Sequence, residues 1–274
     1  MINNILEEKP KTLLDKFLID YNTIENIDII KARELIKRTM RYYNGDSNER
    51  NKLVHLQDME NRWYKLEDYS IYNDTYYFTD LWSCWIIYSR KYLKSIIKKG
   101  TLTNYITNIS IKDLLSLNIQ SILDLGCGLG YTSATLKQLF KEVKVYATNL
   151  DNTKQYRFCK LMSEKYNFTL TSSIYNISSN IDLVFASEYF EHIKNPLEHL
   201  QEIITLLHPK AFIIANSFNT RSIGHFKEYK HFGEIICEKK ISRYFNNYLK
   251  LQNYIKIKTK IWNNKPSLFI RAST

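Results

Sequence analysis

The segment Ser121–Tyr131, which reads SILDLGCGLGY, is the feature that most constrains the fold of this chain. It places three glycines at alternate positions directly after an apolar run that contains one aspartate. The chain has only seven glycines among its 274 residues, so three within five residues mark a place that needs backbone without side chains. Glycines between a strand and a helix allow a tight turn, close approach of a ligand, and helix N-terminal amides that point at it. The segment therefore predicts a strand, a ligand-binding turn and a helix.

Apolar segments of strand and helix type alternate from Leu117 onward. The pattern predicts strands at 122–125, 143–148, 168–171, 181–186 and 211–216, and helices at 131–140, 154–166 and 196–207. Such alternation is typical of a parallel sheet with helices on both faces. The end of the chain departs from it, because the apolar segments 253–262 and 267–271 flank a short polar turn. This hairpin predicts an antiparallel last strand.

The first hundred residues show helical spacing of apolar residues. The stretch Trp63–Tyr92 is dense in aromatic residues, and its second part predicts a buried helix from Thr79. These aromatics are typical of a packed core, and a substrate pocket stays open as an additional role. We place the junction at Gly100. The expected organisation is an aromatic-rich helical extension at 1–100, forming an acceptor-side cap, and a ligand-binding domain at 101–274.

Composition and cysteine usage limit the expected compartment and partners of the protein. The apolar fraction of 44% is enough for a sizeable core. The four cysteines are far apart and form no Cys-x-x-Cys pair, so we expect no disulfide and a reducing cytoplasm. The start of the chain lacks the pattern of a signal peptide, and the most apolar run, 85–88, is too short to span a bilayer. The net charge of +11 permits contact with nucleic acid or anionic membrane, but the lysines are scattered.

The glycine segment, with its strand-end acid, resembles the shared motif of the class I S-adenosylmethionine-dependent methyltransferases. Its spacing differs from the dinucleotide fingerprint, and no P-loop lysine follows. The resemblance extends from Leu117 to Ser273 through the fourth strand, an acidic E-H-type loop at 187–193, a helix, a Leu-x-Pro turn and the terminal hairpin. It implies a Rossmann-like, doubly wound, seven-stranded, mostly parallel α/β sheet whose last strand is antiparallel, and S-adenosyl-L-methionine as cofactor.

The resemblance also implies the cofactor-binding positions. The glycine loop lies under the methionine moiety and ribose, the second strand end takes the ribose hydroxyls, the loop after the third strand takes the adenine, and the fourth strand tip lies beside the sulfonium. The implied residues are Asp124, Gly126, Cys127, Gly128, Gly130, Asn149, Leu150, Asp151, Ser172, Ser173 and Ser187. The family usually has Asp or Glu where Asn149 stands, and asparagine brings one acceptor oxygen and no charge. Either Asn149 or Asp151 therefore takes the ribose.

The catalytic candidates are Glu188, Glu191 and His192, in the spacing E-x-x-E-H. Carboxylates and an imidazole at this spacing suit acid–base chemistry or a divalent metal. The segment resembles the metal-binding segment of the small-RNA 2′-O-methyltransferases and of the ubiquinone-pathway O-methyltransferases. In the former a further histidine follows the fifth strand, and His225 and His231 are the candidates. We expect catalysis without a metal; if a metal binds, the ligands implied are Glu188, Glu191, His192 and His225.

We therefore expect a methyltransferase that acts on an oxygen or nitrogen nucleophile of an unidentified acceptor, either a small molecule or nucleic acid. One alternative is an RNA 2′-O-methyltransferase that uses a Glu/His metal site. Another is a catalytically silent binding module of the same fold, suggested by Asn149. The segment 218–244 carries basic and aromatic residues and is expected to form either a substrate lid, a phosphate-contacting surface or a solvated loop.

Overall fold

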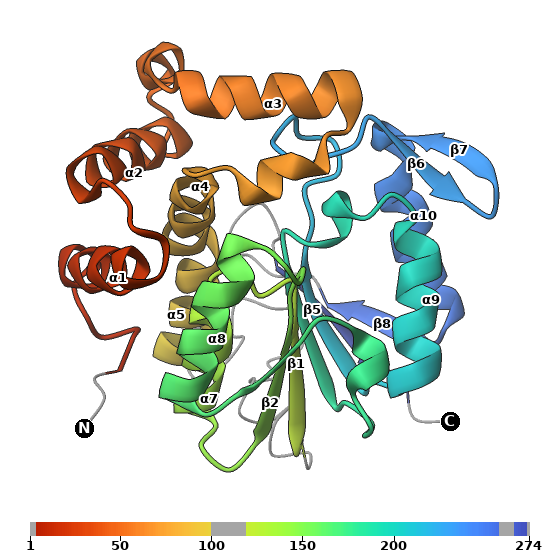
Figure 1. Ribbon diagram of the computed structural model, residues 1–274. Coiled ribbons are helices and arrows are strands. Elements are labelled where there is room, and N and C mark those ends of the chain that lie inside the picture. Colours follow the sequence, from red (N-terminus) through yellow and green to blue (C-terminus); the bar gives the residue numbers. More distant parts are fainter. Residues whose placement is uncertain (1–3, 100–118, 258–265, 273–274) are drawn as a thin grey trace.

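The computed structural model describes residues 4–99, 119–257 and 266–272. A seven-stranded sheet in the order β3-β2-β1-β4-β5-β9-β8 forms the centre of the molecule (Figure 1). Its strands are β1 Ser121–Leu125, β2 Lys144–Thr148, β3 Thr169–Thr171, β4 Leu183–Ser187, β5 Ala211–Ala215, β8 Tyr254–Ile257 and β9 Ser267–Arg271. The first five strands pair in parallel, and β9 runs antiparallel to both β5 and β8. This confirms the predicted sheet, including its antiparallel last strand.

Helices cover both faces of the sheet. They are α7 Tyr131–Leu139, α8 Lys154–Tyr166, α9 Pro196–Leu207 and α10 Glu238–Leu251, with the short 3-10 turns η4 Ile174–Asn176 and η5 Phe190–His192. Local sequence signals fix their ends. The hydroxyl of Thr153 accepts from the backbone N–H of Tyr156 and so caps α8, and α9 begins at a proline. Both helices therefore begin at the residues that the sequence predicts.

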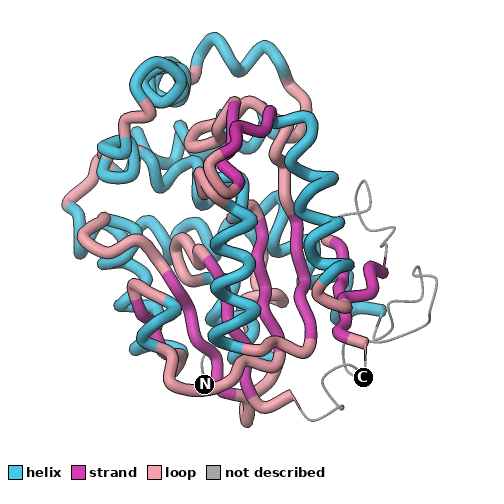
Figure 2. The backbone as a smooth tube through the Cα atoms, turned by 90° about the vertical axis from the view of Figure 1, so that its right-hand side faces the viewer, coloured by secondary structure: helices cyan, strands magenta, loops and turns pink. Residues whose placement is uncertain are grey.

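The core lies on both sides of the sheet, because successive residues of each strand point to opposite faces. Ile122 and Phe185 pack in the cluster on one face, with side chains from α7 and α8. Leu123 and Val184 pack in the other, with α9 and α10. Figure 2 shows the strands running side by side, with helices packed along them. Burial on both faces explains why the strands read as continuous apolar runs in the sequence.

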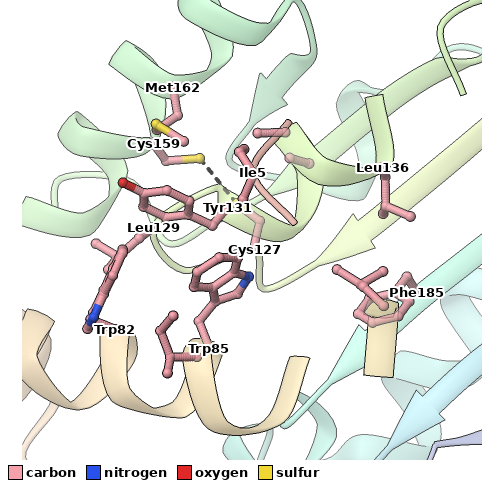
Figure 3. Close-up of a cluster of buried hydrophobic side chains, with 14 of the residues drawn as sticks. Ile5, Trp82, Trp85, Cys127, Leu129, Tyr131, Leu136, Cys159, Met162 and Phe185 are labelled. Carbon is pink, nitrogen blue, oxygen red and sulfur yellow. Dashed lines mark hydrogen bonds between the residues drawn. The ribbon is translucent and has the colours of Figure 1, made fainter. Parts of the chain in front are cut away.

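The N-terminal helices form a cap that packs against the sheet domain. They are α1 Pro10–Glu25, α2 Ile29–Tyr43, η1 Ser47–Lys52, α3 Val54–Leu66, η2 Tyr69–Asn73, α4 Tyr77–Cys84, the π-helical turn η3 Trp85–Ser89, and α5 Arg90–Lys99. The Phe17 ring stacks on Trp82 at 4.5 Å, and Trp85 lies 4.7 Å from Tyr131 of α7 (Figure 3). The predicted helix from Thr79 is confirmed, and its aromatics join the cap to the main core.

The segment 218–244 is not the plain loop that one interpretation of the sequence favoured. It contains the hairpin of β6 Glu228–His231 and β7 Glu234–Cys237 and the start of α10. The hairpin escapes sequence analysis because its strands have four residues each, and Tyr229 and Ile236 are their only buried positions. The predicted junction at Gly100 and the terminal turn at 263–266 fall largely or wholly outside the described residues. Within the described parts, no helix combines the length and apolar character needed to cross a membrane.

Candidate active site

A cavity of about 530 Å³ opens at the carboxyl ends of β1 and β4, where the strand order reverses. Its volume lies within the range typical of small-molecule sites, and this edge of a doubly wound sheet is where ligands bind. Four parts of the chain line it: the cap, the glycine loop, the tip of β4 and the segment after β5. The fold thus brings the cap and both predicted functional loops to one space.

The glycine loop forms the bare wall of this cavity. Gly126 and Gly128 have φ of 62° and 54°, in the left-handed region that disfavours side chains. A Cβ on Gly126 would lie 2.3 Å from the Tyr189 ring, whereas a Cβ on Gly128 would meet only Leu81, at 3.9 Å. Gly126 is therefore needed for packing, and Gly128 leaves free space on the cavity side. The loop therefore leaves its backbone accessible from the cavity at Gly128, and the predicted contact with a ligand stays a prediction.

Asp124 lies at the end of β1 and also lines the cavity. Its carboxylate is 3% exposed and accepts a hydrogen bond of 2.5 Å from the hydroxyl of Ser133. Burial raises the pKa of Asp124 to about 7, and the bond from Ser133 opposes that rise only in part. The carboxyl group is therefore poised to exchange its proton near neutral pH.

Asp124→Asn is expected to stabilise the fold increasingly as pH rises. Because the pKa of Asp124 is raised in the folded state, its contribution to stability is present below its unfolded pKa and is lost as pH rises towards 7. Asparagine removes that loss while keeping an oxygen for Ser133. Urea unfolding should show the variant gaining about 2–3 kcal/mol over the parent chain between pH 5 and pH 8. The same difference at both pH values would contradict the assignment.

The predicted acidic segment and one predicted histidine come together at the tip of β4. Ligand atoms of Glu188, Glu191 and His225 all lie within 4.8 Å of one another. Glu188 adopts a left-handed φ of 52°, and its N–H donates to the Ala215 carbonyl at 2.7 Å. Glu191 is fully buried; one carboxylate oxygen accepts from the Ser217 N–H at 2.6 Å and the other has no hydrogen-bond partner in the described structure. A buried carboxylate oxygen of this kind suits a bound cation.

The orientation of His225 is fixed by two contacts from different elements. Its Nδ1 lies 2.7 Å from the carbonyl of Thr220, which favours the tautomer with a proton on Nδ1 and a lone pair on Nε2. Its own carbonyl accepts a 2.7 Å hydrogen bond from the indole N–H of Trp63 in α3. A carbonyl that accepts the Nδ1 proton is the usual support for a metal-binding histidine.

His192 lies beside His225 but does not belong to the group of Glu188, Glu191 and His225. Its ring is 4.7 Å from that of His225, edge to face, and it lines the cavity. Burial lowers the pKa of His192 well below its usual range, with a smaller effect from neighbouring His225. Burial and neighbouring Glu188 raise the pKa of Glu191. His231, the other histidine candidate, lies on β6 against Phe232 and Tyr244 and does not line the cavity.

The residues that the sequence predicts to bind the ribose and the adenine do not line this cavity. The Asn149 amide donates to the Gly128 carbonyl at 2.6 Å, and its oxygen accepts from the Leu150 N–H. Asn149 thus fastens the tip of β2 to the glycine loop. None of Asn149, Leu150, Asp151, Ser172 and Ser173 is among the cavity-lining residues, whereas Ser187 is, and its hydroxyl accepts from that of Ser89 in η3. Their contacts with cofactor stay predictions.

Two cysteines lie against the glycine loop. Cys127 and Cys159 are buried thiols with their sulfurs 3.3 Å apart. All four cysteines of the chain fall within the described residues, and each is a free thiol in the structure.

The cap supplies lining residues that the sequence analysis did not single out, among them Tyr43, Asp80, Trp85 and Tyr88. One feature of the sequence could have pointed to them. Asp80 is the only acid within the apolar run 76–88, and a charge in a buried helix needs a partner or a ligand. Arg221, after β5, also lines the cavity. Sequence patterns could not place these residues in one cavity with the glycine loop, because that requires the packing of the cap on the sheet domain.

The lining fits the S-adenosylmethionine that the resemblance implies. Gly128 leaves space at the cavity wall, and several carboxylates face a ligand whose sulfonium and ammonium are cationic. The indole N–H of Trp85 is buried at this wall without a hydrogen-bond partner in the described structure, and so offers a donor to a ligand carboxylate. Figure 3 shows the Trp85 ring next to Cys127 and Tyr131.

Comparison with known proteins agrees with this fold. A family model described as a methyltransferase domain matches residues 89–255, more than half of the chain. No curated protein matches the sequence. Among solved structures, the methyltransferase domain of bacterial CtHen1-C is 16% identical with a TM-score of 0.45, over 67% of this chain and all of that one. The plantazolicin methyltransferase BpumL, solved with a triazolic desmethylPZN analog and SAH, is 13% identical with a TM-score of 0.36, over 68% of this chain and 60% of that one.

An O-methyltransferase of a trans-AT PKS multienzyme from Brevibacillus brevis, in complex with S-adenosyl-L-homocysteine, is 16% identical with a TM-score of 0.33, over 48% of this chain and 47% of that one. This chain therefore spans less than half of the length of that protein. The family assignment rests on the domain match, together with the sheet order and the glycine loop. The chain belongs to the methyltransferase domain family and is a class I methyltransferase that takes its methyl group from S-adenosylmethionine.

Proposed function

We propose that this enzyme transfers the methyl group to a hydroxyl oxygen of its acceptor, and that Glu188, Glu191 and His225 hold a divalent cation beside that oxygen. The observation that carries the proposal is their grouping within 4.8 Å at the cavity, with an unpartnered oxygen on buried Glu191. Two carboxylates and one imidazole suit Mg²⁺ or Mn²⁺, which bind hard oxygen ligands. When bound, such a cation lowers the pKa of a hydroxyl that it contacts.

The protein's own groups then position the reactants and accept the proton. Methyl transfer is an in-line displacement, so much of its acceleration comes from holding the oxygen about 3 Å from the methyl carbon. Glu188 and Ser187 at the tip of β4 line the same cavity as the glycine loop and would bound the place where the two reactants meet. His192, whose pKa is lowered by burial, is neutral at pH 7 and can take the hydroxyl proton.

The cap at residues 1–100 is proposed to form the acceptor side of the site. Tyr42, Glu60 and Tyr77 belong to it and line the cavity, opposite the segment that carries Arg221. The indole of Trp63 and the hydroxyl of Tyr64 fasten that segment to α3, through the His225 carbonyl and the Ser222 N–H. An acceptor held by these cap residues would lie in the same cavity as Glu188 at the tip of β4.

Metal binding tests the proposal directly. We expect Mn²⁺ to bind the S-adenosylhomocysteine-loaded protein in calorimetry, and Glu188→Gln to weaken that binding at least about 10-fold, because it removes one charged ligand. The matched control is Glu202→Gln on α9, whose side chain is 45% exposed and lies beside His199 instead. Equal Mn²⁺ affinity for the parent chain and Glu188→Gln would refute the site.

A nucleic-acid acceptor is the second candidate. It is favoured by the rim of the cavity, where the Arg221 guanidinium and the Lys227 ammonium both lie over the Tyr64 ring, at 4.6 and 5.2 Å. Cations beside an aromatic ring suit a phosphate next to a stacked base. If RNA is the acceptor, its affinity should fall about 10-fold or more between roughly 50 and 200 mM salt, measured by fluorescence anisotropy. Binding that does not change over this range would exclude this candidate.

A further inference from the structure

The cavity wall formed by α2 and α4 combines a buried acid with tyrosines. Asp80 is 6% exposed and lines the cavity together with Tyr43, Tyr77 and Tyr88. One oxygen of Asp80 accepts a hydrogen bond from the neutral Tyr43 hydroxyl. A buried carboxylate with a single neutral donor is costly unless a ligand completes its interactions. The wall is therefore built to face something polar.

The charge of the cavity is opposite to that of the whole chain. Glu60, Asp80, Asp124 and Glu188 line it, and among the described lining residues Arg221 is the only arginine or lysine. The remaining positive charge of a chain with net charge +11 lies elsewhere. Burial raises the pKa of Asp80 to about 6, with a smaller contribution from Glu60, so its carboxyl group is still mainly ionised at pH 7. A cation here would compensate a charge that burial leaves poorly solvated.

We propose that this wall binds a cationic group of the methyl acceptor, an ammonium or alkylated ammonium, with Asp80 as counter-charge and the surrounding tyrosine rings as cation–π partners. The ring faces of tyrosine attract such cations, most strongly where water is excluded. The proposal rests on the proposed function only in taking this part of the cavity as the acceptor side. It adds the substrate class: an amine-bearing acceptor small enough to share a cavity of about 530 Å³ with the cofactor.

Three ligands that share a phenol ring and differ in charge test the proposal. The probes are tyramine, neutral 4-ethylphenol and anionic 3-(4-hydroxyphenyl)propionate, titrated by NMR into the full chain saturated with S-adenosylhomocysteine, at pH 7.5 and with EDTA. We expect tyramine to bind at least about 10-fold more tightly than 4-ethylphenol, and the anion to bind most weakly. Because no metal and no methyl transfer are involved, failure of the proposed metal chemistry leaves this result unchanged.

Two variants test whether Asp80 causes the preference for tyramine. Asp80→Asn keeps an acceptor for the Tyr43 hydroxyl and should reduce the tyramine preference to about 2-fold, with affinity for 4-ethylphenol unchanged. The control is Asp58→Asn on α3, where the side chain is 65% exposed. Equal binding of all three probes, no binding of any, or preference for the anion would each overturn the proposal on the parent chain alone. A loss of S-adenosylhomocysteine affinity in Asp80→Asn, with tyramine preference kept, would assign Asp80 to the cofactor's ammonium instead.

Discussion

Glu191→Gln is expected to lower the turnover of the enzyme by about 100-fold while leaving affinity for S-adenosylhomocysteine within about 2-fold. Glutamine keeps the carbonyl oxygen that accepts from the Ser217 N–H, so the turn after β4 retains its support. It removes the negative charge next to Glu188 and His225, which the proposed cation requires. Loss of a residue that handles the proton or the cation costs on the order of 100-fold or more. Turnover, once an acceptor is in hand, and calorimetry measure the two quantities.

Turnover and cofactor affinity together decide what Glu191 does. The control is Glu202→Gln on α9, where the side chain is half exposed. Glu198→Gln on the same helix is not suitable, because the Glu198 carboxylate accepts from the Phe232 N–H. If Glu191→Gln retains full turnover, Glu191 supports the fold alone. If it binds cofactor poorly, the charge serves the cofactor site instead.

Gly128→Arg is expected to abolish cofactor binding, with a loss of affinity of at least about 100-fold. The Cβ position at Gly128 faces space in the cavity, with only Leu81 within 4 Å, so a long side chain would fill the place of the ligand. A backbone φ of 54° adds strain of about 1 kcal/mol, which is small beside that steric effect. Calorimetry with S-adenosylhomocysteine and S-adenosylmethionine measures the loss. Retained affinity would also remove the support for an enzyme over a silent binding module of the same fold.

A matched glycine separates the two effects. Gly233, at the tip of the β6–β7 hairpin, has φ of 87° and no atom within 4 Å of its Cβ position. Gly233→Arg therefore carries comparable backbone strain without entering the cavity. It should bind cofactor like the parent chain, and any large loss there would mean that Gly128→Arg acts through the backbone.

The fold could be predicted from the sequence because its signals are local and repeated. The apolar runs of β1 and β4, the cap of α8 and the first proline of α9 each specify one element, and their order specifies the sheet. The β6–β7 hairpin could not be predicted, because its strands have four residues each and one face packs on α9 and α10. Its pairing depends on contacts with distant helices, which periodicity does not report.

The site was predictable where one segment carries it and unpredictable where several meet. Glu188 and Glu191 follow from a contiguous spacing after β4. His225 and His231 were indistinguishable in the sequence. In the structure His225 lies near the carboxylates, where Thr220 and Trp63 hold it. Asp80 belongs to a wall that exists only when α4 packs over the glycine loop. Side chains that converge from separate elements need the tertiary arrangement.

The hydrogen bond from Trp63 to the backbone of His225 links the cap, the proposed acceptor side, to the stretch that carries a proposed metal ligand. A homologue that exchanged its N-terminal helices for others would lose the fixed imidazole along with the old specificity. Acceptor choice and reactivity in this lineage should therefore diversify together, through paired changes in α3 and in the stretch after β5, and seldom by replacement of either one alone.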